Sequence, residues 1–186
     1  TTQTFDFIGS GLYALSLTGI IYGFSILPHW TGFFLLATGA LLLIFFGLYE
    51  KRQAYPVFNI RLFLGNRVFK MSTISALINY SATFAISFMM SLYLQYIRGF
   101  TPGKAGLILI IQAVIQALVS LKSGSMSDKR SPAMLATLGM GIISASLLCL
   151  AFIDESTSII FIGILLAVLG FGFGMFSSPN TNIIMS

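Results

Sequence analysis

The sequence has very few charged residues. Lysine, arginine, aspartate and glutamate together make up 8% of its 186 residues, whereas a soluble domain carries about 25%. Hydrophobic residues make up 56%, and the mean hydropathy is +0.94. A chain so poor in charge and so rich in apolar side chains is not a soluble globular domain. This composition is typical of a membrane protein.

The sequence also has few of the residues that enzymes and metal sites need. It contains one cysteine, one histidine and five acidic residues. Cys149 has no second cysteine with which to form a disulfide, and His29 lies between Pro28 and Trp30 in a pattern that indicates an interfacial turn. No carboxylate pair, nucleophile–base pair or phosphate-binding loop occurs in an apolar segment. We therefore expect no enzyme activity, no metal and no cofactor.

Nearly all charges lie between six long segments that contain none. A helix of about 20 apolar residues crosses the hydrocarbon core of a bilayer. Five of the segments are long enough. The fourth is long enough only if its helix continues through Lys122 to about Met126. This is possible because a lysine side chain can reach the membrane interface. We predict an all-α membrane protein with six transmembrane helices. The uncharged segments are Phe7–Pro28, Trp30–Tyr49, Met71–Ile97, Ala105–Leu121, Ser131–Ile153 and Ser156–Ser186.

No aspartate or glutamate lies inside these six segments. A desolvated carboxylate can supply the titrating group that proton coupling requires, whereas an amide cannot. If the protein is coupled to protons, we expect its carboxylate to lie outside this chain.

Basic residues indicate which side of the membrane is cytoplasmic, because short cytoplasmic loops are enriched in lysine and arginine. Eight of the ten basic residues lie between the second and third segments or at the junction of the fourth and fifth. Only Arg98 and Lys104 lie on the other side. We therefore predict a cell-membrane protein with both ends in the cytoplasm. The net charge of +5 then reflects topology and contact with anionic lipids, and not nucleic-acid binding.

Polar residues form stripes on two predicted helices. In the third segment they recur every fourth residue, from Asn79 and Thr83 to Gln95, and in the fourth they include Gln112 and Gln116. Amides in a bilayer need partners, so both stripes should face other helices or a water-filled cavity. Both alternatives remain open. As a cavity wall, Asn79, Thr83, Gln112 and Gln116 would line a substrate pathway.

Small residues predict where helices pack closely. Gly170, Gly172 and Gly174 occur in the sixth segment, followed by Pro179, which should kink the helix or free nearby backbone groups. The polar side chains around it, those of Ser177, Ser178, Asn180 and Asn182, can satisfy the released groups. Packing is favoured over nucleotide binding, because the glycine spacing is wrong and no strand precedes it. Other predicted packing positions are Gly19 and Gly23 in the first segment and Thr137, Gly141, Ala145 and Cys149 in the fifth.

Several short motifs resemble a known family. The loop Gly124-Ser125-Met126-Ser127-Asp128-Lys129-Arg130 resembles the G-x-x-x-D-(R/K) motif of the major facilitator superfamily. The segments Phe5–Gly9, Pro56–Phe63 and Gly170–Pro179 are similar to its fourteen-helix drug:proton antiporter branch. By this resemblance, Gly124, Asp128, Lys129 and Arg130 would form a gating loop that controls opening to the cytoplasm.

The resemblance also implies a domain organisation. Residues 1–50 would form a two-helix hairpin between two six-helix bundles, and residues 51–70 a basic cytoplasmic loop with a possible interfacial helix. Residues 71–186 would be four helices of a truncated C-terminal bundle. The chain lacks an initiator methionine and stops inside a helical pattern, so we expect a fragment whose N-terminal bundle and last helices are missing partners.

For function, the resemblance implies a segment of a secondary transporter that exports amphipathic or drug-like compounds in exchange for protons. Such transporters work by alternating access, with sites between bundles near the midplane. The alternative is a membrane module that only assembles, with its glycine faces and amide stripes serving helix association and possible homo-oligomers.

Overall fold

The computed structural model is almost entirely helical, and it describes residues 6–53, 58, 60–127 and 131–185. Within these residues, six helices are long and apolar enough to cross a membrane, which confirms the sequence prediction. The chain divides into two compact units, Thr1–Arg67 and Val68–Ser186.

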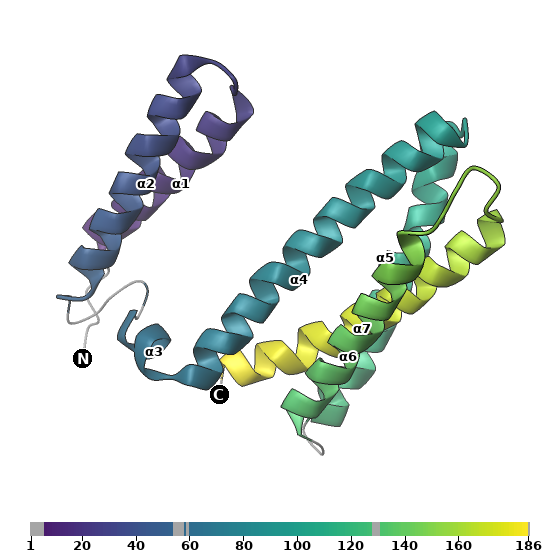
Figure 1. Ribbon diagram of the computed structural model, residues 1–186. Coiled ribbons are helices and arrows are strands. Elements are labelled where there is room, and N and C mark those ends of the chain that lie inside the picture. The colour runs from purple at the N-terminus through teal and green to yellow at the C-terminus, as the bar shows by residue number, and fades with distance from the viewer. Residues whose placement is uncertain (1–5, 54–57, 59, 128–130, 186) are drawn as a thin grey trace. The chain divides into compact units, whose positions relative to one another are not determined.

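The first unit contains a helical hairpin (Figure 1). Helix α1 (Phe7–Ser25) and helix α2 (Trp30–Glu50) are joined by a short turn and pack through glycines. Gly19 faces the backbone of Gly39, and a Cβ atom at Gly23 would lie 2.9 Å from a backbone nitrogen of α2. Small residues hold membrane helices together because they let the two backbones approach closely.

A short helix, α3 (Ile60–Gly65), follows this hairpin. It lies in the basic segment where the sequence predicts a possible interfacial helix. The ring centroids of Phe58 and Phe63 are 6.4 Å apart, and Phe58 is exposed. An exposed aromatic ring in a basic segment is compatible with contact at a membrane surface.

The second unit is organised around its last helix. Helix α7 packs along both α5 and α6, which approach each other at few points (Figure 1). Helix α4 packs less closely and contributes Met90 to the buried apolar core. The elements of this unit are α4 (Arg67–Leu92), the π-helical turn η1 (Tyr93–Ile97), α5 (Pro102–Ser127), α6 (Pro132–Leu150) and α7 (Ile159–Met185).

Alternating glycines allow α7 to lie close to two helices at once. A Cβ atom at Gly170 would overlap the backbone carbonyl oxygen of Gln112 on α5, and one at Gly174 would also meet α5 backbone. A Cβ atom at Gly172 would instead lie 3.0 Å from the Gly139 carbonyl oxygen on α6. Residues four apart share a helix face, whereas residues two apart do not. The spacing of two therefore allows close approach to α5 and α6 from different faces of α7.

The packing face of α6 differs from the prediction. The small residues expected to pack are all exposed, and a Cβ atom at Gly141 would have no neighbour within 4 Å. These exposed residues are Thr137, Gly141, Ala145 and Cys149. The buried residues of α6 are Leu135, Ala136, Gly139, Ile143, Ser146 and Leu150. Small residues occur on both faces, so the position of α7 decides which face is buried.

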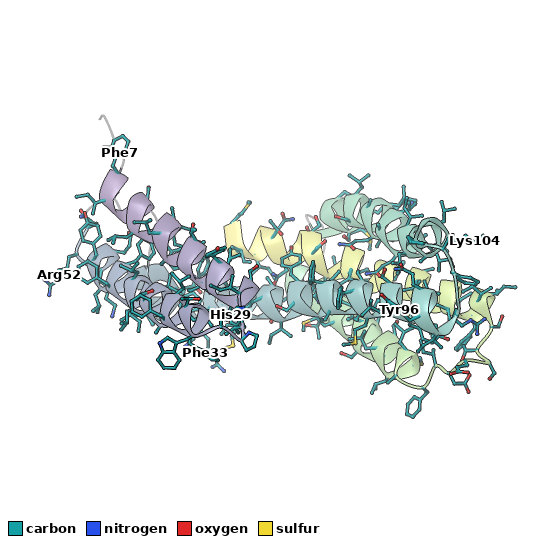
Figure 2. All side chains as sticks on the ribbon, turned by 90° about the horizontal axis from the view of Figure 1, so that it is seen from above. Phe7, His29, Phe33, Arg52, Tyr96 and Lys104 are labelled. Carbon is teal, nitrogen blue, oxygen red and sulfur yellow. The ribbon has the colours of Figure 1, made fainter. Side chains whose placement is uncertain are left out.

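Large apolar side chains are exposed on helices of both units. Phe33 on α2 is 52% exposed, and Phe84 on α4 is 77% exposed. Figure 2 shows side chains standing out from the helices, with Phe33 labelled. Soluble monomers rarely expose contiguous apolar patches larger than a few hundred Å². Apolar side chains distributed over all long helices fit contact with lipid.

Candidate functional site

The polar stripe on α4 forms hydrogen bonds along its own helix. The Thr83 hydroxyl donates to the carbonyl oxygen of Asn79 at 2.8 Å, and the Ser87 hydroxyl donates to that of Thr83 at 2.9 Å. The Gln95 amide donates to the carbonyl and hydroxyl oxygens of Ser91 at 3.1 and 2.8 Å. Such bonds satisfy polar groups in an apolar medium without a second helix. Most of this stripe is therefore stabilised locally.

Two amide side chains behave differently. Asn79 on α4 and Gln112 on α5 are each only 4% exposed, and no hydrogen bond engages either side chain among the described residues. Their amide atoms are not among the fully buried side-chain atoms that lack a hydrogen bond, so the remaining exposure of both residues reaches these atoms. Gln116 is half-buried, and no bond within the described chain joins it or Gln112 to Asn79 or Thr83. The structure therefore provides two largely buried amide residues, but no direct link between the two predicted stripes.

The predicted gating motif begins at the end of α5. A Cβ atom at Gly124 would lie 2.7 Å from the hydroxyl oxygen of Ser178 on α7, so the two helices are close at this glycine. The Ser127 hydroxyl donates to the Gly124 carbonyl oxygen at 2.7 Å. The three charged members of the motif, Asp128, Lys129 and Arg130, lie outside the described residues.

Hydrogen bonds between α5 and α7 extend this contact. The Asn182 amide donates to the Ser127 hydroxyl oxygen at 2.6 Å, and the Ser123 hydroxyl donates to the Gly174 carbonyl oxygen at 2.6 Å. Polar groups that bond each other inside a bilayer hold helices together. Neither Ser123 nor Ser127 was predicted to bond α7, although Ser127 lies inside the motif that resembles a gating loop. Their spacing of four on one helix face was the available signal.

The polar residues around Pro179 also serve contacts between helices. Pro179 lies inside α7 and is fully buried. The sequence predicts that its polar neighbours satisfy backbone groups freed by the proline. In the structure, the Asn180 amide instead donates to the Ser72 carbonyl oxygen on α4 at 3.1 Å, and Asn182 bonds α5. Among the described side chains of this run, only that of Thr181 bonds its own helix, and it donates to the Ser177 carbonyl oxygen.

Two carboxylates lie together at one end of the α1–α2 hairpin. Asp6 caps α1, accepting the Gly9 backbone N–H at 2.8 Å. A Cβ atom at Gly9 would lie 2.7 Å from Asp6 Oδ2 and 2.8 Å from Glu50 Oε1. Glu50 is only 2% exposed. The second uncharged segment ends at Tyr49, but α2 continues through Glu50, so a carboxylate does lie within a membrane-length helix. Its burial follows from the contact with α1, which composition does not show.

An apolar groove of about 560 Å³ lies between the α4–η1 helix and α6. None of the four predicted pathway residues lines it. Its walls include Ile86, Met89, Met90, Tyr93, Leu147 and Ile153. Among the described residues, no group of three or more histidine, cysteine or acidic residues is arranged to hold a metal ion.

Comparison with known proteins gives a consistent result. The model of the Major Facilitator Superfamily matches residues 2–186. The chain is 26% identical over 184 residues to the riboflavin transporter RibZ of Clostridioides difficile, covering 99% of this chain and 40% of RibZ. It is 29% identical over 154 residues to the methylenomycin A resistance protein of Streptomyces coelicolor, covering 83% and 32% of the two proteins.

A third relative is the multidrug resistance protein Stp of Mycobacterium tuberculosis. The identity is 24% over 191 residues, and the match covers 99% of this chain and 35% of Stp. The chain thus spans less than half the length of each of these three relatives.

Proposed function

The chain belongs to the Major Facilitator Superfamily, and we propose that it is part of a secondary transporter that exports small amphipathic or drug-like compounds in exchange for protons. Membership of this family indicates a membrane transporter and not an enzyme. One relative is named a riboflavin transporter and two are named resistance proteins. These names support a small organic substrate, with alternating access as the mechanism.

The observation that carries the proposal is that two amide residues are largely buried while their side chains form no hydrogen bond in the described chain. Asn79 and Gln112 lie on membrane-length helices and are each 4% exposed. A polar group of a substrate would supply the missing bonds when the helices separate to admit it. Amides are neutral, so they would recognise substrate through hydrogen bonds and not through charge pairing. We assign Thr83 and Gln116 to the same pathway.

The α5–α7 contact supports a gating role for Gly124, Asp128, Lys129 and Arg130. Gly124 approaches Ser178, and the neighbouring Ser127 bonds α7. A movement of the loop that follows α5 would therefore act on both helices. In this proposal the loop is cytoplasmic, as the distribution of basic residues predicts.

An assembly-only module is less well supported. The glycines that would mediate association between copies are already used inside the chain. Gly19 and Gly23 face α2, whereas Gly170 and Gly174 face α5. A glycine face occupied by a helix of the same chain is not available to a second copy.

The proposal is tested by transport in sealed vesicles that contain the complete protein carrying this chain. The variants are Asn79→Leu and Gln112→Leu, and uptake of a panel of amphipathic compounds that carry hydrogen-bonding groups is measured under an imposed proton gradient. We expect each variant to lower transport of at least one compound roughly tenfold, because a lost polar contact to substrate changes rate by about that factor.

Gln95→Leu is the matched control, since Gln95 is an amide on the same helical segment but bonds Ser91. It should retain transport. Unchanged transport of every compound by both test variants, at normal abundance, would contradict the assigned pathway. Gradient-independent movement in the unmodified protein would contradict proton exchange.

A further inference from the structure

The α4 helix ends in an unusual turn. Its last residues form the π-helical turn η1, in which the Arg98 backbone N–H donates to the Tyr93 carbonyl oxygen at 3.1 Å. The Phe100 N–H then donates back to the Leu94 carbonyl oxygen at 2.9 Å, and Gly99 between them has φ +65°. A glycine adopts this left-handed conformation without steric cost. Single π-helical turns are irregular points in a helix and often occur at functional sites.

The end of this helix lies near the loop between α6 and α7 (Figure 1), and two of its side chains bond that loop. The Tyr93 hydroxyl donates to the Asp154 carbonyl oxygen at 2.6 Å. One guanidinium nitrogen of Arg98 donates to the carbonyl oxygens of Glu155 and Thr157 at 2.5 and 2.9 Å. All three acceptors are backbone oxygens, so the contact depends on the backbone conformation of the loop.

The loop is held in that shape by its own first residue. One carboxylate oxygen of Asp154 accepts bonds from the Ser156 N–H at 2.9 Å, the Ser156 hydroxyl at 2.7 Å and the Thr157 hydroxyl at 2.9 Å. The Asp154 N–H donates in turn to the Thr157 hydroxyl oxygen at 2.9 Å. The loop therefore presents its carbonyl groups in a fixed arrangement to Tyr93 and Arg98.

Elsewhere α4 is held loosely. It makes few close backbone approaches to other helices, and the apolar groove lies between its α4–η1 end and α6. Tyr93 and Ile153 line the groove and also lie at or beside the hydrogen-bonded loop. The Asn180–Ser72 bond holds α4 near its opposite end. The bonds from Tyr93 and Arg98 are thus placed to control the distance between α4 and α6 at the groove.

We propose that Tyr93 and Arg98, together with residues 154–157, form a latch. Closed, the latch fixes the end of α4 to the α6–α7 loop and keeps the groove narrow. When the three hydrogen bonds break, this end of α4 moves at η1 and the groove widens. A segment with few close contacts and a small number of hydrogen bonds is suited to such local opening. This inference does not depend on the proposed transport function.

Cysteine alkylation measures the latch directly in the complete protein, reconstituted in vesicles. Cys149 and any cysteine outside this chain are replaced by serine, and Met90→Cys is introduced as a reporter, since Met90 lines the groove and is 5% exposed. Tyr93→Phe combined with Arg98→Met removes all three bonds. We expect alkylation by N-ethylmaleimide to accelerate roughly tenfold or more, because each lost hydrogen bond shifts a local opening equilibrium several-fold.

Lys104→Met is the matched control. Lys104 is a cation at the start of α5 (Figure 2), and its side chain makes no hydrogen bond within the described part of the chain. It should leave the rate unchanged. Arg98→Lys retains a hydrogen-bond donor, so alkylation of Met90→Cys in this variant should stay nearly as slow as with Arg98 present. Tyr93→Phe alone removes only a hydroxyl and should give a smaller acceleration, so the test remains available if the double variant does not fold.

A second reporter separates latch opening from general loosening. This reporter is Leu166→Cys, because Leu166 lies on α7 and is 0% exposed. Its alkylation should stay slow when the latch is broken. Equal acceleration at both reporters, or none at Met90→Cys, would overturn the proposal. Neither alkylation measurement requires a compound to be transported, so a failure of the proposed function would not be mistaken for a failure of the latch.

Discussion

Single polar residues in this chain differ in role because they differ in hydrogen-bond partner. Thr83 and Asn79 belong to one stripe, yet the Thr83 hydroxyl bonds its own helix, whereas the Asn79 side chain is buried with no bond in the described residues. Asp154 shows the opposite case. It is a charged residue, and one oxygen of its carboxylate accepts three hydrogen bonds from its own loop. What a polar residue can do here is therefore decided by the atoms within about 3 Å of it.

Asp154 gives a prediction at this scale. Hydrogen bonds from the side chains of Ser156 and Thr157, followed by backbone N–H groups, lower the pKa of Asp154 below its ordinary value of 3.8. A lowered pKa means that these bonds stabilise the loop fully above the ordinary value and lose that effect as the pH falls through the lowered one. The loop, and the latch with it, should not respond to pH between about 5 and 8.

The measurement is a carboxyl NMR titration of Asp154. We expect a midpoint below 3.8, and a shift back toward 3.8 in the variant Ser156→Ala, Thr157→Val. Ser158→Ala is the control, because the Ser158 hydroxyl oxygen accepts the Ile160 N–H and does not bond Asp154. If the double variant titrates at the same midpoint as the unmodified protein, the side chains of Ser156 and Thr157 do not lower the pKa of Asp154.

Among the helices, α7 is the element on which the second unit depends. It packs against α5 and α6, supplies much of the buried core, and bonds α4 and α5 through Asn180 and Asn182. Its glycines make the close approach possible, because backbone atoms occupy the space where Cβ atoms would lie.

Gly170→Ala tests that role. The added methyl would overlap the Gln112 carbonyl oxygen, and backbone cannot move aside as a flexible side chain can. We expect the free energy of unfolding to fall by about 1–3 kcal/mol. Gly141→Ala is the matched control, since nothing lies within 4 Å of its Cβ position.

Thermal unfolding of the complete protein in detergent compares the two variants. The control should be neutral, or should gain about 0.5–1 kcal/mol from the better helix propensity of alanine. Equal stability of the two variants would show that α7 does not depend on contact at Gly170.

At the scale of the whole molecule, membrane insertion dominates. All six long helices can span a bilayer, and large apolar side chains remain exposed on them. Lipid contact is therefore part of how this chain is stabilised. The charge distribution predicts the orientation, because eight of ten basic residues lie between the second and third uncharged segments or at the junction of the fourth and fifth.

Labelling of single cysteines in intact cells tests this orientation. In the complete protein, with Cys149 and other cysteines replaced by serine, an impermeant maleimide added outside should modify Glu155→Cys and leave Gln53→Cys unmodified. Permeabilised cells should show modification at both positions, which controls for reactivity. The reverse pattern in intact cells would mean that the basic loops face outward.

Much of the fold could be predicted because a bilayer imposes simple demands on a chain. The extension of the fourth segment through Lys122 was also predicted, and α5 does run to Ser127. The packing face of α6 was not predictable, since small residues occur on both sides of that helix. The burial of Glu50 and the partners of Asn180 and Asn182 were missed for a related reason: each depends on a second helix far away in the sequence.

The sequence by itself determined that this is a six-helix membrane chain, where each helix begins and ends within a few residues, and which family it resembles. These properties follow from local hydrophobicity, charge and short motifs. Only the tertiary structure decided which glycines contact a neighbour, which amides are buried, and that Tyr93 and Arg98 bond the α6–α7 loop. Hydrophobicity favours insertion of all six long helices into lipid, whichever neighbours they have. The pairing of faces inside the membrane depends on close packing and on hydrogen bonds between distant residues.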